Sequence, residues 1–176
     1  ISREYRVNFR LLFEIEYTNG EHIAPVLDYL ATDKIHRGFG AKEIDIIAAC
    51  GSLNEEVNLN DLFLFRKVFK YGKQLDTNSI NKIDRSLLEK CLPEGIKIHD
   101  ADIFTIPTVL NSSQNLISEM RQRSNLAGIE LELAHALETM SRFPDVSFKV
   151  IYEVHDKPSG VGEPKEKTIG TYVPGL

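Results

Sequence analysis

Hydrophobic and polar residues follow two periods along this chain, and those periods predict strands and helices. Residues Phe9–Tyr17 place aromatic and aliphatic side chains on one face and charged ones on the other, as in a half-buried strand. Residues Glu21–Thr32 carry apolar side chains at helical spacing, with Pro25 near the first turn. Ile44–Cys50 is apolar on both faces apart from Asp45, which predicts a buried parallel strand.

The rest of the chain continues this alternation of strands and helices. Strands are expected at Leu62–Val68, Ile96–Phe104, Gly128–Leu131 and Val146–Val154, helices at Ser86–Cys91, Ser112–Arg123 and Leu133–Phe143, and a polar surface loop at Tyr71–Ile83. The alternation indicates an α/β fold in three layers, with a mostly parallel twisted sheet and helices on both faces. We expect one domain over residues 1–158 and a Gly/Pro-rich tail over residues 159–176.

Composition narrows the range of partners. The 176 residues suit one domain, and the net charge of -5 argues against a nucleic-acid backbone or an anionic membrane as the main partner. No apolar stretch approaches the ~20 residues that a membrane-spanning helix needs. The two cysteines form no disulfide framework, so a reducing, cytoplasmic location is expected.

Four short segments lie where predicted strands end, and ligands of open α/β sheets bind beyond the carboxyl ends of strands. The segments are Ala48-Ala49-Cys50-Gly51-Ser52-Leu53 (before Asn60-Asp61-Leu62), Asp102-Ile103-Phe104, Gly128-Ile129-Glu130-Leu131-Glu132-Leu133-Ala134, and Val154-His155-Asp156.

In this order, the segments resemble motifs of the nucleoside phosphorylase and nucleosidase superfamily. They are similar to its G-[ST]-A-G-[SG]-L turn followed by G-D-[LV], its D-x-F element, its V-E-M-E-x-x-A element and its V-S-D strand end. The resemblance covers roughly Gly20 to Pro158. It implies a purine-type nucleoside as the ligand and cleavage of its N-glycosidic bond, by a nucleosidase or a phosphorylase.

The resemblance also implies roles for individual residues. Glu132 would accept hydrogen bonds from the ribose hydroxyls, as an acceptor-only carboxylate can. Asp156 would protonate the base at N7, which needs a raised pKa. Phe104 would stack on the purine ring, a contact that contributes roughly 1–3 kcal/mol. The other implied substrate contacts are Glu130, near base and ribose, Leu131, which replaces the usual Met under the sugar, Ile103 and Gly51.

No metal and no cofactor is implied, because inorganic phosphate or water serves as the co-substrate. Members of the superfamily form dimers, trimers or hexamers, so a homo-oligomer is expected.

Two departures from the pattern bear on activity. Ile46 lies where phosphorolytic members carry an Arg, which favours hydrolysis, and Ala48 replaces a Gly of the turn, which leaves less room for an anion. The superfamily's first strands, with a general-base Glu, and its long C-terminal helix have no counterpart in the sequence. Either the chain is a fragment of a larger protein, or it is a trimmed, non-catalytic member that senses a ligand or binds a partner.

Plainer interpretations of the same residues stay open. Glu130 and Glu132 could be solvated surface residues, Phe104 a core residue, and Asp156 a turn cap. A metal site could also gather from the His and Asp residues of the last segments, although no H-x-x-x-H spacing supports it; its members would be His99, Asp100, Asp102, His155 and Asp156.

Overall fold

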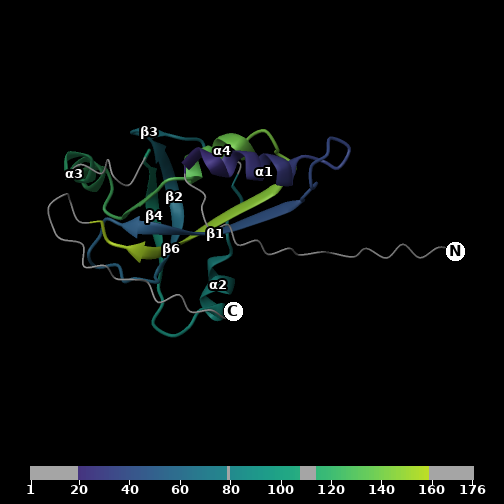
Figure 1. Cartoon of the computed structure of the whole chain (residues 1–176). Coiled ribbons are helices and arrows are strands. Elements are labelled where there is room, and N and C mark those ends of the chain that lie inside the picture. Colours follow the sequence, from purple (N-terminus) through teal and green to yellow (C-terminus); the bar gives the residue numbers. More distant parts are fainter. Residues whose placement is uncertain (1–19, 79, 108–113, 159–176) are drawn as a thin grey trace.

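The computed structural model describes residues 20–78, 80–107 and 114–158, which form six strands and several helices (Figure 1). In chain order the elements are the 3-10 helix η1 (Gly20–His22), α1 (Ile23–Ala31), β1 (Glu43–Ser52), β2 (Leu62–Lys70), β3 (Lys73–Gln74), α2 (Arg85–Cys91), β4 (Ile98–Thr105), α3 (Gln114–Arg123), β5 (Ala127–Glu130), α4 (Leu133–Met140) and β6 (Ser147–Asp156).

The strands form one mixed sheet in the order β3-β2-β4-β5-β1-β6. The long pairings β1–β6 and β2–β4, and the shorter β4–β5, are parallel. The short pairings β1–β5, β2–β3 and β2–β6 are antiparallel. Since β6 also pairs with β2, strands β2, β4, β5, β1 and β6 close into a barrel.

The α/β class is therefore confirmed, but the sheet was predicted to be mostly parallel, and this one is mixed and closes into a barrel. The difference has a local origin: the carboxyl end of β1 overlaps the middle of β5 over two residues, where Gly51 faces Ile129 and Ser52 faces Gly128. A two-residue antiparallel overlap leaves no mark on the hydrophobic period of either strand, so sequence patterning could not show it.

A first core cluster fills the space between the strands and helices α1 and α4, which lie side by side along one side of the sheet (Figure 1). β6 supplies alternate side chains to it, because period-2 alternation points every second residue inward. Phe63 of β2 is completely buried there. The buried residues of β6 are Phe148, Val150, Tyr152 and Val154.

A second, smaller core lies between α3 and the opposite surface of β4 and β5. Ile117 and Met120 of α3 pack there against Phe104, Ala127 and Ile129. Ile103 belongs to the first core and Phe104 to the second, so the two neighbours on β4 point to opposite faces of the strand.

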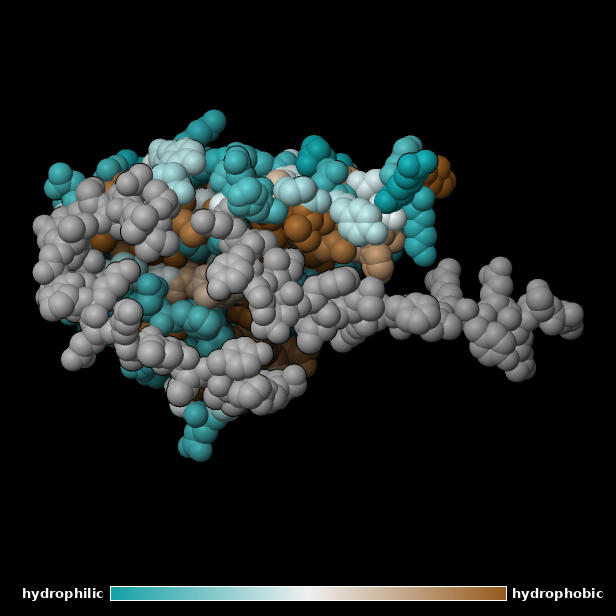
Figure 2. All heavy atoms as spheres, viewed as in Figure 1, coloured by the Kyte–Doolittle hydropathy of each residue, from teal (hydrophilic) through white to brown (hydrophobic). Residues whose placement is uncertain are grey.

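The prediction that β1 is buried on both faces was wrong. Ile47 is 76% exposed, and Asp45 and Ala49 on the same face are exposed too. A barrel strand has an inner and an outer face, and the helices do not cover the outer face of β1 at Ile47. Hydrophobic residues accordingly lie between hydrophilic ones on the surface of the protein (Figure 2).

Most predicted elements are present within a few residues of their expected limits. Within the expected loop 71–83 the chain forms the short strand β3, and the helix expected to reach Phe143 ends at Met140. The strand expected at Phe9–Tyr17 and the tail 159–176 lie outside the described residues. Over the part of the chain that the structure describes, no helix is both long and apolar enough to cross a bilayer.

Asp61 connects the start of β2 to the start of β4. Its side chain is buried and accepts hydrogen bonds from the Asn58 N–H at 3.0 Å, the Lys97 N–H at 3.0 Å and His99 Nε2 at 2.9 Å. Burial acts to raise the pKa of Asp61, but these three hydrogen bonds outweigh it and lower the pKa. The acidic residue of the G-D-[LV]-like segment therefore has a structural role in holding two strand ends together.

Asp61→Ala is expected to lower the free energy of unfolding by about 1–3 kcal/mol, because it leaves buried donors without an acceptor. Urea denaturation at neutral pH measures this. The control is Asp100→Ala, which removes an exposed carboxylate of β4 that pairs with Arg85 of α2 and should cost less than about 1 kcal/mol. Equal costs for the two variants would contradict the structural role of Asp61.

Candidate functional site

The carboxylate of Glu130 lies fully buried where β5 meets α4. Its Oε2 accepts hydrogen bonds from the Glu132 and Leu133 N–H groups, both at 2.6 Å, and from the Tyr152 hydroxyl at 3.2 Å. Its Oε1 accepts a hydrogen bond from the Thr105 hydroxyl. Burial raises the pKa of Glu130, and the four donors oppose that shift because they stabilise the ionised form.

Thr105, Glu130 and Tyr152 together form a buried network, the Glu130 network, at the N-terminus of α4. Thr105 Oγ1 accepts the Ala134 N–H at 3.0 Å, so two side chains receive three of the N–H groups that begin the helix. The partial positive charge of a helix N-terminus favours a carboxylate there. Burial raises the pKa of Tyr152, and the charge of Glu130 raises it further, so its hydroxyl stays protonated and donates.

Glu132 is the residue at which α4 begins, and it is partly buried. Its Oε2 accepts the N–H of Leu131 at 3.2 Å. Burial, followed by the charge of Glu130, raises the pKa of Glu132 to about 7, although hydrogen bonds from the backbone of Leu131 and Gly20 act in the opposite direction. This carboxylate therefore changes charge near neutral pH.

Gly51 and Asp156 lie beside each other at the ends of β1 and β6. Their pairing follows a register shift after Cys50, which brings Asp156 level with Gly51. A Cβ on Gly51 would lie 2.5 Å from Asp156 Oδ1 and 2.7 Å from Pro158 Cγ, so only glycine fits. Asp156 is exposed, and its carboxylate borders the surface formed by this strand end.

Glu130 and Asp156 flank the end of β1 from opposite sides. β1 pairs with β5 on one side and with β6 on the other, so their backbones lie roughly 10 Å apart, two strand spacings. The Cys50 thiol lies between them: burial raises its pKa, and the charges of Glu130 and Asp156 raise it further. The fold thus brings three of the sequence-predicted segments to one end of the barrel.

The predicted residues of the D-x-F segment are packed in the two cores. Phe104 is 2% exposed, and its ring stacks on Phe69 with centroids 4.7 Å apart and planes at 12°. Ile103 is completely buried, and its Cδ1 would lie 2.8 Å from a Cβ on Gly128. Leu131 is partly buried against the second core. None of these side chains is presented to solvent as an open binding surface.

The residues considered for a metal site are dispersed. His99 pairs with Asp61, Asp100 with Arg85, and Arg66 makes a two-pronged ion pair with the buried Asp102 at 2.9 Å. Within the residues described, no three His, Cys, Asp or Glu side chains gather closely enough to hold a metal ion.

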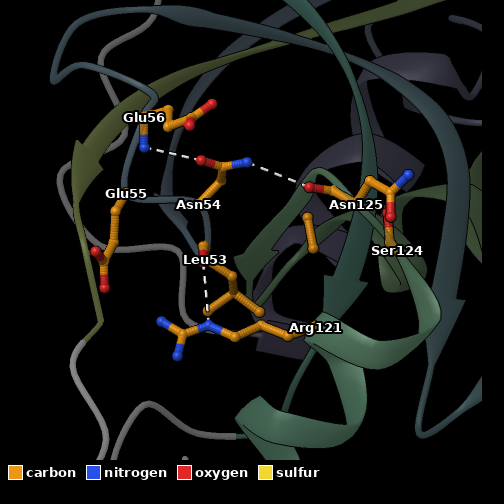
Figure 3. Close-up of a pocket in the computed structure, with 8 residues that line it drawn as sticks. Leu53, Asn54, Glu55, Glu56, Arg121, Ser124 and Asn125 are labelled. Atoms are coloured by element: carbon orange, nitrogen blue, oxygen red, sulfur yellow. Dashed lines mark hydrogen bonds between the residues drawn. The ribbon is translucent and has the colours of Figure 1, made fainter.

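Two hollows among the described residues lie away from the three carboxylates. One, of about 520 Å³, starts directly after Ser52 and is bordered by Arg121 of α3, whose Nε donates to the Leu53 carbonyl at 3.1 Å (Figure 3). The other, of about 550 Å³, lies between the loop after β3 and the loop before β6. Glu130, Glu132 and Asp156 line neither hollow: Glu130 is buried, Glu132 is partly buried and Asp156 is exposed.

Sequence reasoning missed two members of this arrangement, Thr105 and Tyr152. Thr105 directly follows the D-x-F segment, and Tyr152 occupies an inward position of an apolar strand. A hydroxyl at an inward strand position was the available signal, since a buried hydroxyl needs a hydrogen-bond partner.

Comparison of the sequence gives no relative, since no family model matches it and neither does any curated protein. Comparison of the structure, in contrast, gives many solved structures that are similar to it.

The structure is similar to the 5'-methylthioadenosine/S-adenosylhomocysteine nucleosidase of Campylobacter jejuni, with a TM-score of 0.59, 21% identity, and coverage of 84% of this chain and 67% of that one. It is also similar to the nucleosidase of Colwellia psychrerythraea in complex with adenine, with a TM-score of 0.57, 15% identity, and coverage of 79% of this chain and 62% of that one. A futalosine hydrolase mutant of Helicobacter pylori gives a TM-score of 0.58 and 15% identity, with coverage of 79% of this chain and 66% of that one. These neighbours belong to the nucleoside phosphorylase and nucleosidase superfamily, so the predicted resemblance is confirmed as a likeness of fold.

The titration of Glu132 gives a prediction for stability. Its pKa rises from 4.5 in the unfolded chain to about 7 in the folded one, so the folded state binds the extra proton. Stability should therefore fall as the pH rises from about 4.5 to 7 and level off above that, by roughly 1–3 kcal/mol from this group after solvent screening.

Urea denaturation between pH 5 and pH 8 measures this effect as the difference between the parent and Glu132→Gln. The neutral amide cannot ionise, so the variant should gain stability relative to the parent as the pH rises. A constant difference between the two proteins across this range would show that Glu132 titrates normally.

Proposed function

We propose that this domain binds a purine-type nucleoside and cleaves its N-glycosidic bond by hydrolysis. The observation that carries the proposal is that the end of β5, two residues before Glu132, and the end of β6, with Asp156, flank the Gly51 strand end from opposite sides, within a nucleosidase-like fold. The neighbours named above supply the reaction class: their names describe two nucleosidases and a hydrolase.

The two carboxylates suit different tasks in this reaction. Glu132 in its ionised form accepts hydrogen bonds from the ribose hydroxyls, and a diol bound there stabilises that form. Asp156 in its protonated form donates to the base, so that the base leaves as a neutral group while the sugar becomes oxocarbenium-like. The absence of a side chain on Gly51 leaves room for the Asp156 carboxylate beside the strand end.

Hydrolysis is favoured over phosphorolysis by the residue at position 46. Ile46, where phosphorolytic members carry an Arg, is partly buried against the first core and offers no charge to a phosphate. Water is then the co-substrate, and no other cofactor is needed. Assembly into a homo-oligomer stays a prediction for this chain.

A second candidate is nucleoside binding without chemistry, as one module of a sensor. The packing of Phe104 against Phe69 favours it, because the expected stacking ring for the base is already stacked within the protein. The same two carboxylates would then bind the ligand without turnover.

Incubation of the protein with a panel of nucleosides, with and without phosphate, tests both candidates by the appearance of free base. Hydrolysis predicts base release from a purine nucleoside that added phosphate does not accelerate. Binding seen in a thermal-shift assay without release of base from any nucleoside would reject the enzyme and leave the binding module.

Asp156→Asn should lower kcat by roughly 10²–10⁴-fold, since a general acid contributes about that much, while nucleoside affinity changes little. Glu132→Gln should instead raise KM, and parent affinity should rise with pH through about 7 as Glu132 ionises. The matched control is Asp45→Asn, an exposed carboxylate at the other end of β1, which should behave as the parent. Full turnover by Asp156→Asn would remove Asp156 from the mechanism.

A further inference from the structure

Glu130 matches a substrate contact of the superfamily by sequence, but every hydrogen bond that the structure gives its carboxylate is to the protein itself. One oxygen receives three donors, two backbone N–H groups and the Tyr152 hydroxyl, and the other receives the Thr105 hydroxyl. The side chain is 4% exposed. A ribose hydroxyl could reach this carboxylate only by opening the packing around it, since the side chain is buried and four internal donors already occupy its two oxygens.

The same bonds determine where Glu132 lies. The N–H groups of Glu132 and Leu133 both point at Glu130 Oε2, so the backbone from which the Glu132 side chain extends is held on both sides of its Cα. Thr105 holds the next residue of the same turn through the Ala134 N–H. Thr105, Glu130 and Tyr152 come from three different strands, so the turn is tied to the barrel rather than to its own segment.

We propose that Glu130 is a positioning residue rather than a substrate contact: with Thr105 and Tyr152 it fixes the start of α4, and thereby the Glu132 carboxylate, in the geometry that receives the ligand. This inference rests on the proposed nucleoside site and deepens it. Misplacement of a binding group by about 1 Å can cost a hundredfold in rate, so loosening the network should affect ligand binding without any lost contact to the ligand.

Thr105 allows the sharpest test, because two variants separate its hydroxyl from its shape. Thr105→Val keeps the shape and removes both hydrogen bonds, and Thr105→Ser keeps the hydroxyl. The control is Thr139→Val, which removes a buried hydroxyl within α4, the helix that the network positions. Among the described residues, this hydroxyl donates to the His135 carbonyl at 2.9 Å, and it lies nine residues after Glu130 in the sequence. All three full-length variants are compared by circular dichroism, thermal denaturation and nucleoside affinity.

The expected result is a roughly tenfold to hundredfold weaker nucleoside affinity for Thr105→Val, with Thr105→Ser and Thr139→Val near the parent even if Thr139→Val is equally destabilised. Parent-like affinity of a folded Thr105→Val would overturn the inference. So would an equal loss in Thr139→Val, because the effect would then be one of general stability.

A second measurement uses no nucleoside: the carboxyl resonance of Glu132 in carbon-13-labelled protein. The charge of Glu130 acts on Glu132 from β5, both carboxylates act on Tyr152 of β6, and the backbones of Gly20, Leu131 and Glu132 donate to the Glu132 carboxylate. Glu130→Gln should lower the titration midpoint of Glu132, and Thr105→Val should shift its resonance while Thr139→Val does not. If the parent binds no nucleoside, the proposed function fails while these shifts still support the positioning role; unchanged resonances overturn the inference itself.

Discussion

A carboxylate inside a protein is costly unless donors surround it, and Glu130 lies where such donors must come from several elements at once. β5 is only four residues long, and it carries Glu130 at its end. The donors come from β4, β6 and the first turn of α4. Burial of this one charge therefore requires three strands and a helix to meet at one point.

That requirement fits the closed form of the sheet. Tyr152 reaches Glu130 only because β6 lies two strands from β5 on the other side of β1, and the barrel curvature turns both side chains inward. The register shift after Cys50 lies two residues further along β1 than the partner of Tyr152 and brings Asp156 level with Gly51. Lys70, the neighbour of Thr105 in register on β2, adds a second tie to α4 through its ion pair with Glu138 at 2.7 Å. Curvature, register and helix position are thus settled together at this end of the molecule.

The elements could be predicted from hydrophobic periodicity because each carries its own pattern, as the alternating residues Phe148 to Val154 of β6 do. Closure could not be predicted, since it depends on antiparallel overlaps of two residues at β1–β5 and β2–β6. The candidate site divides in the same way. Glu132 and Asp156 stand out through short motifs, whereas the partners of Glu130 lie 25 and 22 residues away and only the fold brings them together.

The charge of Glu130 also connects stability to function. A carboxylate that only capped the helix could be replaced by a neutral acceptor such as Asn or Ser, which are common at helix starts. Glu130 instead places a negative charge beside Glu132 and adds to burial, the larger cause, in raising the pKa of that residue to about 7, at a cost to the folded state. A ligand that donates two hydroxyls to Glu132 would offset this cost, because hydrogen bonds to the ionised form stabilise it. Two carboxylates placed so closely at one helix start therefore make the stability of this turn depend on pH, and a diol bound as in the proposed function would relieve that dependence.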